Sequence, residues 1–402
     1  MAGFYAEIKH KITISVLKIF IKLTPAAATP MTFVGGGSTA KLCEHISRND
    51  VSKILIVTDT ALVDLGIVAK ASDVLSANGL EVIIYDGVLP DPTFDVAAAG
   101  LLMQQEAHCD AVLAIGGGSA IDTAKAISAA ATNGGDIRKM VGFFKAKVAP
   151  LALFAIPTTS GTGSEVTYGA VISDEQSHEK CIIVDPKIVP QAVALDPELI
   201  AGLPPAITAA TGMDALSHAV EAYVSTMASS QSDVYAKMAI KLVFENLPLA
   251  YAQGGNLAAR EQMSIAAYYG GVAINGAAVG NVHAIAHQLG AWYGTPHGVA
   301  NALVMPLVLR FSKEAAEQRL AELADLLALS EAGDSAAVNA NKFIEAVAGL
   351  NETLAIGHKL EALQDSDISA IAKRAVKEGD GYPVPRLMDQ GECEAMIRTL
   401  SQ

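Results

Sequence analysis

Two short stretches of this 402-residue sequence carry ionisable side chains where apolar residues predominate. The first, TGMDALSHAVEAY, holds Asp214 and His218 four residues apart. The second, VHAIAHQLGAWYGTPHG, holds His283 and His287 at the same spacing, with His297 in a Pro-His-Gly turn. On a helix, a spacing of four puts both side chains on one face. Burying so many unpaired polar groups is costly, which indicates that they share a partner.

A divalent cation would be such a partner, because it accepts imidazole nitrogens together with one carboxylate oxygen and neutralises a buried aspartate. Asp214, His218, His283 and His297 offer one oxygen and three nitrogen donors, which suits Zn²⁺ or Fe²⁺ without choosing between them. His287 lies one turn from His283. It is the candidate for a neighbouring group that orients the ligands or handles a proton.

Two glycine-rich loops predict a nucleotide site. GGGS occurs at Gly35–Ser38 and at Gly116–Ser119, and the second copy ends the apolar run AVLAI and opens a helix-like segment. Backbone N–H groups and a helix N-terminus would converge there on a pyrophosphate, which glycine allows to approach the backbone. The loop PTTSGTGSE (157–165) follows the next apolar run and could close over a nucleotide. The usual G-x-G-x-x-G fingerprint is absent, so a simple turn is the alternative for each loop.

Asp59 follows the apolar run ILIVT, at the end of a predicted strand. A carboxylate there can accept hydrogen bonds from an adenosine ribose and repel a 2′-phosphate, which favours NAD over NADP. The alternative is a loop aspartate or a helix N-cap.

The predicted secondary structure that must position these residues changes near residue 200, from alternating strands and helices to helices alone. Before it, apolar runs bounded by turn residues alternate with helical patterns, as in a parallel sheet covered by helices. These runs occupy residues 54–58, 82–86, 111–115 and 151–156. Beyond Pro204 and Pro205, alanine-rich segments with helical periodicity continue to the end. We expect an α/β dinucleotide-binding domain at residues 31–200 and an all-helical (all-α) metal-binding domain at residues 201–402.

The composition narrows the class of protein. Hydrophobic residues make up 51% of the chain and charged residues 17%, enough for a large core. The net charge of −14 argues against a nucleic-acid partner, which would require a basic surface. The four cysteines lack C-x-x-C spacing, which fits structural thiols in a reducing, cytoplasmic compartment. They are Cys43, Cys109, Cys181 and Cys393.

Residues 1–30 have the pattern of an amphipathic extension. Lys11, Lys18 and Lys22 interrupt its apolar run, which is too short and too charged for stable insertion into a membrane. We expect the extension to dock on the protein or on a partner chain, with loose membrane association as the alternative. Together with the strand-like segment MTFVG, it offers surface for a homodimer or a larger homo-oligomer.

Four segments together resemble the iron-containing (group III) alcohol dehydrogenases: GGGSAIDTAK, PTTSGTGSE, TGMDALSHAVEAY and VHAIAHQLGAWYGTPHGVANA. The resemblance runs from about Thr32 to the C-terminus. It implies the fold shared by iron-containing alcohol dehydrogenases and dehydroquinate synthases, with an active site in the cleft between an α/β domain and a helical domain. The metal ligands that it implies are Asp214, His218, His283 and His297, with His287 as an active-site histidine.

The resemblance also implies the nucleotide contacts. Asp59 falls where members that use NAD carry an aspartate. The remaining implied contacts are Gly116, Gly117, Gly118 and Ser119 in a pyrophosphate loop, Thr158, Thr159 and Thr162 in a second loop, and Lys180, which would reach the cofactor.

The implied activity is metal-dependent hydride transfer between NAD and a primary alcohol or aldehyde. The cation, Fe²⁺ with Zn²⁺ as the alternative, would polarise the substrate oxygen, and His287 would relay the proton. Two positions depart from the family pattern. Asp91-Pro92 stands for Asn-Pro, and Gly169 stands where some members carry an asparagine near the substrate, which disfavours a diol substrate.

Other activities on the same fold are the alternatives. They are a lactaldehyde/1,2-diol or glycerol-type dehydrogenase, a hydroxyacid–oxoacid transhydrogenase, and a lyase of the dehydroquinate-synthase kind. The lyase would require a basic pocket for a phosphorylated substrate, and the segments around the histidines are poor in Lys and Arg.

Overall fold

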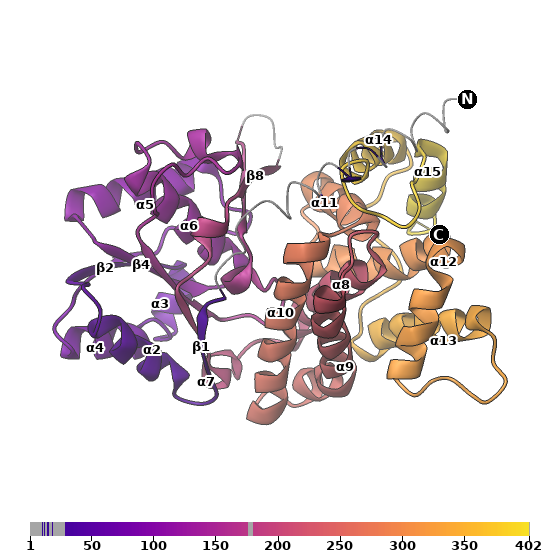
Figure 1. Cartoon of the computed structure of the whole chain (residues 1–402), viewed down its shortest axis with the longest axis horizontal. Coiled ribbons are helices and arrows are strands. Elements are labelled where there is room, and N and C mark those ends of the chain that lie inside the picture. The colour runs from indigo at the N-terminus through magenta and orange to yellow at the C-terminus, as the bar shows by residue number, and fades with distance from the viewer. Residues whose placement is uncertain are drawn as a thin grey trace. The chain divides into compact units, whose positions relative to one another are not determined.

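The computed structural model describes most of the chain, in two compact units (Figure 1). Among the described residues, one unit comprises 29–203 and 255–268, and the other comprises 204–254 and 269–401. The residues described are His10, Ile12, Ile14, Ser15, Lys18, 29–175 and 180–401. Most of the extension predicted at residues 1–30 therefore lies outside the described residues.

A six-stranded parallel sheet forms the centre of the first unit, in the order β1-β9-β6-β4-β2-β3. The four apolar runs predicted as strands correspond to β2, β3, β4 and β6, so the predicted α/β fold class is confirmed. The strand bounds are β1 Met31–Val34, β2 Lys53–Val57, β3 Glu81–Tyr85, β4 Ala111–Gly116, β6 Ala152–Pro157 and β9 Ala192–Leu195.

Helices cover both faces of this sheet (Figure 1). α2 and α4 pack together on one face, and α5 and α6 pack together on the other. Because the helices return the chain to further parallel strands of the same sheet, the strand ends that carry the loops lie at one edge of the sheet. The helices of this unit are α2 Ser38–Ser47, α3 Thr60–Asp64, α4 Ala69–Ala77, α5 Phe94–Ala107, α6 Gly118–Thr132 and α7 Pro197–Ile200.

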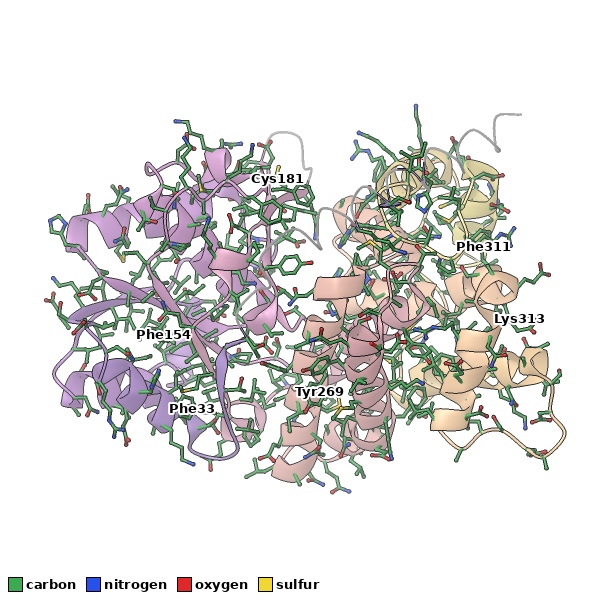
Figure 2. All side chains as sticks on the ribbon, viewed as in Figure 1. Phe33, Phe154, Cys181, Tyr269, Phe311 and Lys313 are labelled. Atoms are coloured by element: carbon green, nitrogen blue, oxygen red, sulfur yellow. The ribbon has the colours of Figure 1, made fainter. Side chains whose placement is uncertain are left out.

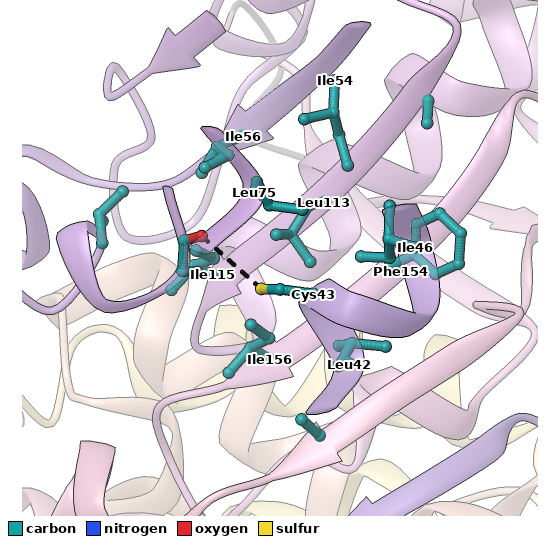
Figure 3. Close-up of a cluster of buried hydrophobic side chains, with 14 of the residues drawn as sticks. Leu42, Cys43, Ile46, Ile54, Ile56, Leu75, Leu113, Ile115, Phe154 and Ile156 are labelled. Atoms are coloured by element: carbon teal, nitrogen blue, oxygen red, sulfur yellow. Dashed lines mark hydrogen bonds between the residues drawn. The ribbon is translucent and has the colours of Figure 1, made fainter. Parts of the chain in front are cut away.

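The core under α2 and α4 follows the alternation of the strands (Figure 3). Ile54 and Ile56 of β2 point into this cluster, while the intervening Leu55 is equally buried and points to the opposite face. The Cys43 thiol of α2 lies in the same cluster and contacts the Ala71 carbonyl oxygen at 3.7 Å. Both faces of the sheet are therefore apolar, as its continuous hydrophobic runs require.

A second, three-stranded sheet was not predicted. It has the order β5-β8-β7, with β7 and β8 antiparallel. β8 carries Cys181 (Figure 2). Its strands are β5 Gly142–Phe143, β7 Gly169–Ser173 and β8 Lys180–Val184, and the short 3₁₀ turns nearby are Ile137–Met140, Ser164–Val166 and Pro186–Ile188.

All four cysteines lie in the described part of the chain, and none of them forms a disulfide. Burial raises the pKa of the Cys43 and Cys393 thiols to about 12 and that of Cys109 to about 11. These three side chains are therefore unreactive packing groups, in keeping with the structural role predicted for them.

The second unit is helical. Within it, α8 packs against α9 and α12, and α11 packs against α12 and α14. α10 begins in the first unit and ends in this one. None of the helices in the described ranges combines the length and apolar character that a membrane crossing requires. The bounds are α8 Pro205–Val224, α9 Ser230–Ala252, α10 Leu257–Ala277, α11 Asn281–Tyr293, α12 His297–Leu326, α13 Ala336–Thr353, α14 Ile368–Gly379 and α15 Gln390–Arg398.

Candidate functional site

Three helices of the second unit carry the predicted metal ligands. α8 begins with Pro205 at its first position, where the fixed φ of proline favours a helix start, and it carries Asp214 and His218. α11 carries His283 and ends at Gly294 in a left-handed conformation. The turn that follows starts α12 at His297, so this imidazole stands at a helix N-terminus.

The ligand atoms converge on the Asp214 carboxylate. Its Oδ1 lies 3.3 Å from Nε2 of His297 and 3.7 Å from Nε2 of His283. The three side chains offer ligand atoms that all lie within 4.8 Å of one another. Asp214 and His283 are buried, whereas about a third of the His297 side chain is exposed. One side of this cluster is therefore open to a small molecule.

His218 lies beside this cluster rather than within it. Its Nε2 is 3.9 Å from Asp214 Oδ1, and its ring stacks on that of His283 with the centroids 4.7 Å apart. Its Nδ1 is buried and has no hydrogen-bond partner among the described residues. The structure thus brings three of the four predicted ligands together and places the fourth ring against them.

Glu221 orients His283. The Nδ1–H group of His283 donates to Oε2 of Glu221 at 2.5 Å, and the backbone N–H of Val282 donates to Oε1 at 2.7 Å. Because Nδ1 carries the proton in this bond, Nε2 faces Asp214 as the atom available to a metal. The buried Glu221 carboxylate therefore sets the tautomer of His283 and accepts a backbone hydrogen bond from the first turn of α11.

Asn301 adjoins all three donor atoms. Its Nδ2 donates to Asp214 Oδ1 at 2.8 Å and lies 3.3 Å and 3.1 Å from Nε2 of His283 and His297. Its Oδ1 is buried without a hydrogen-bond partner in the described part of the chain. This amide, one turn along α12 from His297, belongs to the site.

The charges of the cluster shift its pKa values. Burial alone would raise the pKa of Asp214, but His218 and His297 outweigh it and hold that pKa well below its usual range. Burial lowers the pKa of His218 to about 4. Burial also disfavours a charged His283, yet Glu221 and Asp214 raise its pKa to about 9. The site therefore contains an ionised Asp214 carboxylate, a neutral His218 imidazole and a His283 imidazole whose raised pKa favours the charged form.

These residues fit a divalent cation. The donor set combines one carboxylate oxygen with imidazole nitrogens, and among the described residues Nδ1 of His218 and Oδ1 of Asn301 find no hydrogen-bond partner. A cation at this point would take the place of the proton that the carboxylates hold on His283. We therefore take Asp214, His218, His283 and His297 as the candidate ligands, with Glu221 and Asn301 around them.

The helices that hold these ligands approach closely. A Cβ atom added at Gly298 would lie 1.9 Å from the Ala210 carbonyl oxygen, so the first turn of α12 lies against the α8 backbone. A Cβ at Gly270 of α10 would lie 3.2 Å from the Ala215 carbonyl oxygen. Glycine at these positions lets the three backbones come near enough for short side chains to meet.

His287 belongs to a separate hydrogen-bonded group. Its Nδ1–H donates to Oε1 of Glu378 at 2.6 Å, and that carboxylate also accepts from Tyr382 at 2.8 Å and from Gln288 at 2.8 Å. The ring of His287 stacks on that of His297, with centroids 5.2 Å apart. Glu378 therefore leaves Nε2 of His287 as the atom that can exchange a proton.

The two polar loops of the first unit contact each other. A Cβ at Gly117 would lie 3.3 Å from Thr159 Oγ1, and one at Gly118 would lie 2.7 Å from Thr162 Cγ2. Gly116 has a φ of 157°, and α6 starts directly behind it without a side-chain cap. Glycine is therefore required here because a side chain would collide with the second loop. This requirement is separate from the close approach of a phosphate, for which the sequence pattern predicts glycine.

The first GGGS loop has a different environment. It joins β1 to α2, and the backbone N–H of Thr39 in the first turn of α2 donates to Oδ2 of Asp196 at 3.0 Å. A carboxylate thus already occupies that helix start. This difference favours Gly116–Ser119 over Gly35–Ser38 as the phosphate loop.

Asp59 and Lys180 each have a protein partner. Asp59 is the N-cap of α3, and its Oδ1 accepts from the Leu62 backbone N–H at 3.0 Å. The capping role that the sequence left open is therefore present, and it uses one carboxylate oxygen. Lys180 Nζ donates to Asp91 Oδ1 at 3.0 Å. The carboxylate of the Asp91-Pro92 pair, which stands in place of Asn-Pro, therefore forms an ion pair with this lysine.

Sequence reasoning missed the carboxylates and the amide that orient the histidines. The pattern gave a weak signal for Glu221, which lies seven residues after Asp214 and three after His218, on the same helix face. It gave none for Glu378, which is 91 residues from His287 in sequence. It also passed over Asp122 and Lys125 in the motif GGGSAIDTAK, of which Lys125 is fully buried and Asp122 half-buried.

Comparisons with known proteins agree with this arrangement. Residues 29–197 match the family described as iron-containing alcohol dehydrogenase, and residues 208–401 match the C-terminal part of the Fe-containing alcohol dehydrogenase family. The chain is 40% identical to alcohol dehydrogenase 4 of Saccharomyces cerevisiae (strain YJM789), over 92% of this chain and 96% of that protein. It is 38% identical to the NAD-dependent methanol dehydrogenase of Bacillus methanolicus, over 92% and 97% of the two chains. A solved structure, the alcohol dehydrogenase from Oenococcus oeni, superposes with a TM-score of 0.91 at 35% identity, over 94% of this chain and all of that one.

Proposed function

The chain belongs to the iron-containing alcohol dehydrogenase family, and from this premise we propose that it interconverts simple primary alcohols and their aldehydes, with NAD as the hydride carrier. It is an oxidoreductase of the alcohol dehydrogenase class. The observation that carries the proposal is the convergence of Asp214, His283 and His297 on one point, with His218 against them.

The roles of the side chains follow from their contacts. Asp214, His218, His283 and His297 would hold Fe²⁺, which would supply a Lewis acid for the substrate oxygen, and NAD held by the first unit would supply the hydride carrier. Glu221 accepts the proton of Nδ1 of His283, so that Nε2 is the nitrogen that would lose its proton to a cation. The Nδ2 group of Asn301 donates to Oδ1 of Asp214 and holds that carboxylate in place. These two residues fix the donor atoms before a substrate arrives.

We assign the proton transfer to His287. Its ring stacks on His297, and Glu378 accepts the proton of its Nδ1. Nε2 would take a proton from the alcohol, directly or through water, during oxidation and return it during reduction. Tyr382 and Gln288 hold Glu378 in place, which fixes the direction of the imidazole.

We assign the nucleotide to the two loops that contact each other. Gly116, Gly117, Gly118 and Ser119 would bind the pyrophosphate at the start of α6. Thr158, Thr159 and Thr162 would supply hydroxyl groups from the second loop, and Lys180 would exchange its contact with Asp91 for the cofactor. Asp59 has a second oxygen that can accept from the ribose, which favours NAD over NADP.

The substrate proposal rests on size and polarity. Gly169 brings no side chain to the place where a diol-specific member would hold an asparagine, so the second hydroxyl of a diol would find no partner there. We therefore favour short, unbranched primary alcohols over diols.

We also propose a cytoplasmic homo-oligomer, most simply a homodimer. β1 is an edge strand of the large sheet, and Met31 and Val34 on it are 53% and 43% exposed. An exposed apolar edge strand is a natural surface for a second copy. The four reduced cysteines suit the cytoplasm.

One experiment tests the function. Protein purified without oxygen is analysed for bound metal and assayed with NAD and NADP across straight-chain C2–C8 alcohols, with 1,2-propanediol as the diol control. We expect about one Fe per chain, with Zn²⁺ as the alternative ion, and NAD-dependent turnover that chelation abolishes. Protein that binds metal but turns over no alcohol would contradict the proposal. Preference for the diol would contradict the substrate assignment alone.

A further inference from the structure

Three ionisable side chains lie beside the two polar loops of the first unit, outside the groups assigned so far; two of them are buried and Asp122 is half-buried. They are Asp122 and Lys125 on α6 and Glu165 in the second loop, and none of the surface of Lys125 is exposed to solvent. A lysine is almost never fully buried without specific partners, because its charge must be taken out of water. The partners of this lysine therefore indicate its role.

All the partners of the Lys125 ammonium group belong to one segment. Nζ donates to the Ser164 hydroxyl at 3.0 Å, to the carbonyl and hydroxyl oxygens of Thr167 at 2.8 Å and 2.9 Å, and to the Gly169 carbonyl oxygen at 2.7 Å. These residues run from the end of the second loop at Ser164 to the start of β7 at Gly169. Within the described residues, the hydrogen bonds of Lys125 therefore tie α6 to this segment.

Asp122 ties the same segment from the preceding turn of α6. Its Oδ1 accepts from the Ser164 hydroxyl at 2.5 Å, and its Oδ2 accepts from the backbone N–H of Val171 at 2.9 Å. Both carboxylate oxygens are thus used. Asp122 and Lys125 share Ser164, which joins the two residues into one hydrogen-bonded unit.

The anchored segment continues directly into the second loop. The backbone N–H of Ser164 donates to Thr162 Oγ1 at 3.1 Å, and Thr162 in turn lies against Gly118. On the other side of the loop, the Thr158 backbone N–H donates to the Gly116 carbonyl oxygen at 3.0 Å. The position of the threonine hydroxyls relative to the glycine loop therefore depends on how segment 164–171 is held.

The Lys125 side chain is protonated at neutral pH, as the anchoring of segment 164–171 requires. Burial lowers the pKa of Lys125 to about 8, while the charges of Asp122 and Glu165 oppose that shift. The ammonium group therefore still carries its proton at neutral pH. Protonated, it can donate to several oxygen atoms at once, which a neutral amine does less well.

We propose that Asp122 and Lys125 are positioning residues for the nucleotide: they hold segment 164–171 against α6 and so keep Thr159 and Thr162 in place beside the glycine loop before NAD binds. This inference rests on the proposed function. Both residues act through segment 164–171, without a contact to the cofactor. Their effect is to raise the fraction of protein in which both halves of the nucleotide site are already formed.

The test compares nucleotide affinity in the metal-loaded wild-type protein and in Lys125→Met. NADH binding is followed by the fluorescence of the dihydronicotinamide, metal content by elemental analysis, and folding by circular dichroism. We expect the Kd for NADH to rise at least about tenfold, as when only a tenth of the protein has the loop formed. Metal content should not change, and kcat at saturating NAD should fall much less than kcat/KM. Lys125→Arg should restore part of the affinity.

A milder pair of variants keeps the test decisive if Lys125→Met does not fold. Ser164→Ala removes the hydroxyl shared by Asp122 and Lys125. Ser128→Ala removes a buried hydroxyl from the same helix α6, one that bonds the Leu151 carbonyl oxygen at 2.8 Å and not the loop segment. We expect Ser164→Ala to weaken NADH binding several-fold more than Ser128→Ala.

The outcomes separate this proposal from the function on which it rests. Equal NADH affinities in Ser164→Ala, Ser128→Ala and the wild-type protein would overturn the positioning role and leave the dehydrogenase assignment intact. Loss of metal together with NADH affinity in Lys125→Met would indicate a general loss of structure, and the comparison of Ser164→Ala with Ser128→Ala would then decide for or against the positioning role. A wild-type protein that binds metal but no NADH would overturn both.

Discussion

The Nδ1 atom of His283 lies 2.5 Å from Oε2 of Glu221, and both side chains are buried. This contact decides which nitrogen of the imidazole faces Asp214. In Glu221→Gln, the amide Oε1 can still accept from the Val282 N–H, but its NH₂ group then faces Nδ1. That arrangement favours the tautomer with a proton on Nε2, which cannot bind a metal.

We therefore expect Glu221→Gln to weaken metal binding by roughly 10–100-fold. The measurement is the metal retained after dialysis against a graded series of chelator concentrations. Glu314→Gln, which changes an exposed glutamate of α12, is the matched control and should behave like the wild-type protein. Full metal retention in Glu221→Gln would contradict the tautomer argument.

His287→Gln should slow turnover by about 100-fold or more, the usual contribution of a proton-transfer group, with metal content unchanged. Glu378→Gln should slow it less, because an amide oxygen can still accept from Nδ1 of His287 but the negative charge that stabilises the protonated imidazole is lost. Metal analysis beside steady-state kinetics separates the roles. Loss of metal in His287→Gln would make this residue a ligand instead.

Replacing Asp59 tests its two roles separately. Asp59→Asn keeps a side-chain oxygen for the Leu62 N–H but removes the charge, whereas Asp59→Gly removes both. We expect both variants to gain activity with NADP relative to NAD, because the repulsion of a 2′-phosphate is lost. Only Asp59→Gly should lose stability, and only by a few tenths of a kcal/mol. Unchanged KM ratios for NAD and NADP in both variants would show that Asp59 serves the helix alone.

The stability of the protein should depend on pH through Glu165. Burial raises the pKa of this carboxyl group to about 7. A folded-state pKa above the unfolded value gives stability that is complete below about pH 4.5 and is lost as the pH rises through about 7. Glu165→Gln cannot ionise, so its stability relative to the wild-type protein should increase between about pH 5 and pH 8, by at most about 3 kcal/mol.

Urea unfolding at those two pH values measures the effect. Glu106→Gln, an exposed change on α5, is the control and should show no such trend. A difference between Glu165→Gln and the wild-type protein that stays constant with pH would mean that Glu165 remains ionised in the folded protein.

The hydrophobic pattern allowed the large sheet to be predicted, because buried strands leave continuous apolar runs such as 111–115. It did not allow the small sheet to be predicted. β7 alternates between half-buried and buried positions, and β8 has a single buried position, Ile183, so neither strand is buried throughout. Short strands of this kind depend on the segment beside them more than on their own composition.

The histidines were visible in the sequence because imidazoles are rare in apolar helices. Their carboxylate partners were not, since a glutamate in an alanine-rich helix has the same appearance on a solvated face as on a buried one. Glu378 orients His287 from 91 residues away, and only the packing of α14 on α11 brings the two together. Local spacing finds groups on one helix, and it cannot find those that another helix supplies.

The close approach at Gly298 limits how this protein can change. This residue offers no atom to a cation, a substrate or a nucleotide, yet any side chain there would push α12 away from Ala210 and carry His297 with it. A substitution at 298 would therefore be selected against as strongly as the loss of a ligand. Random mutagenesis scored by activity would mark it as essential, and only a structure distinguishes such a spacer from the residues that perform the chemistry.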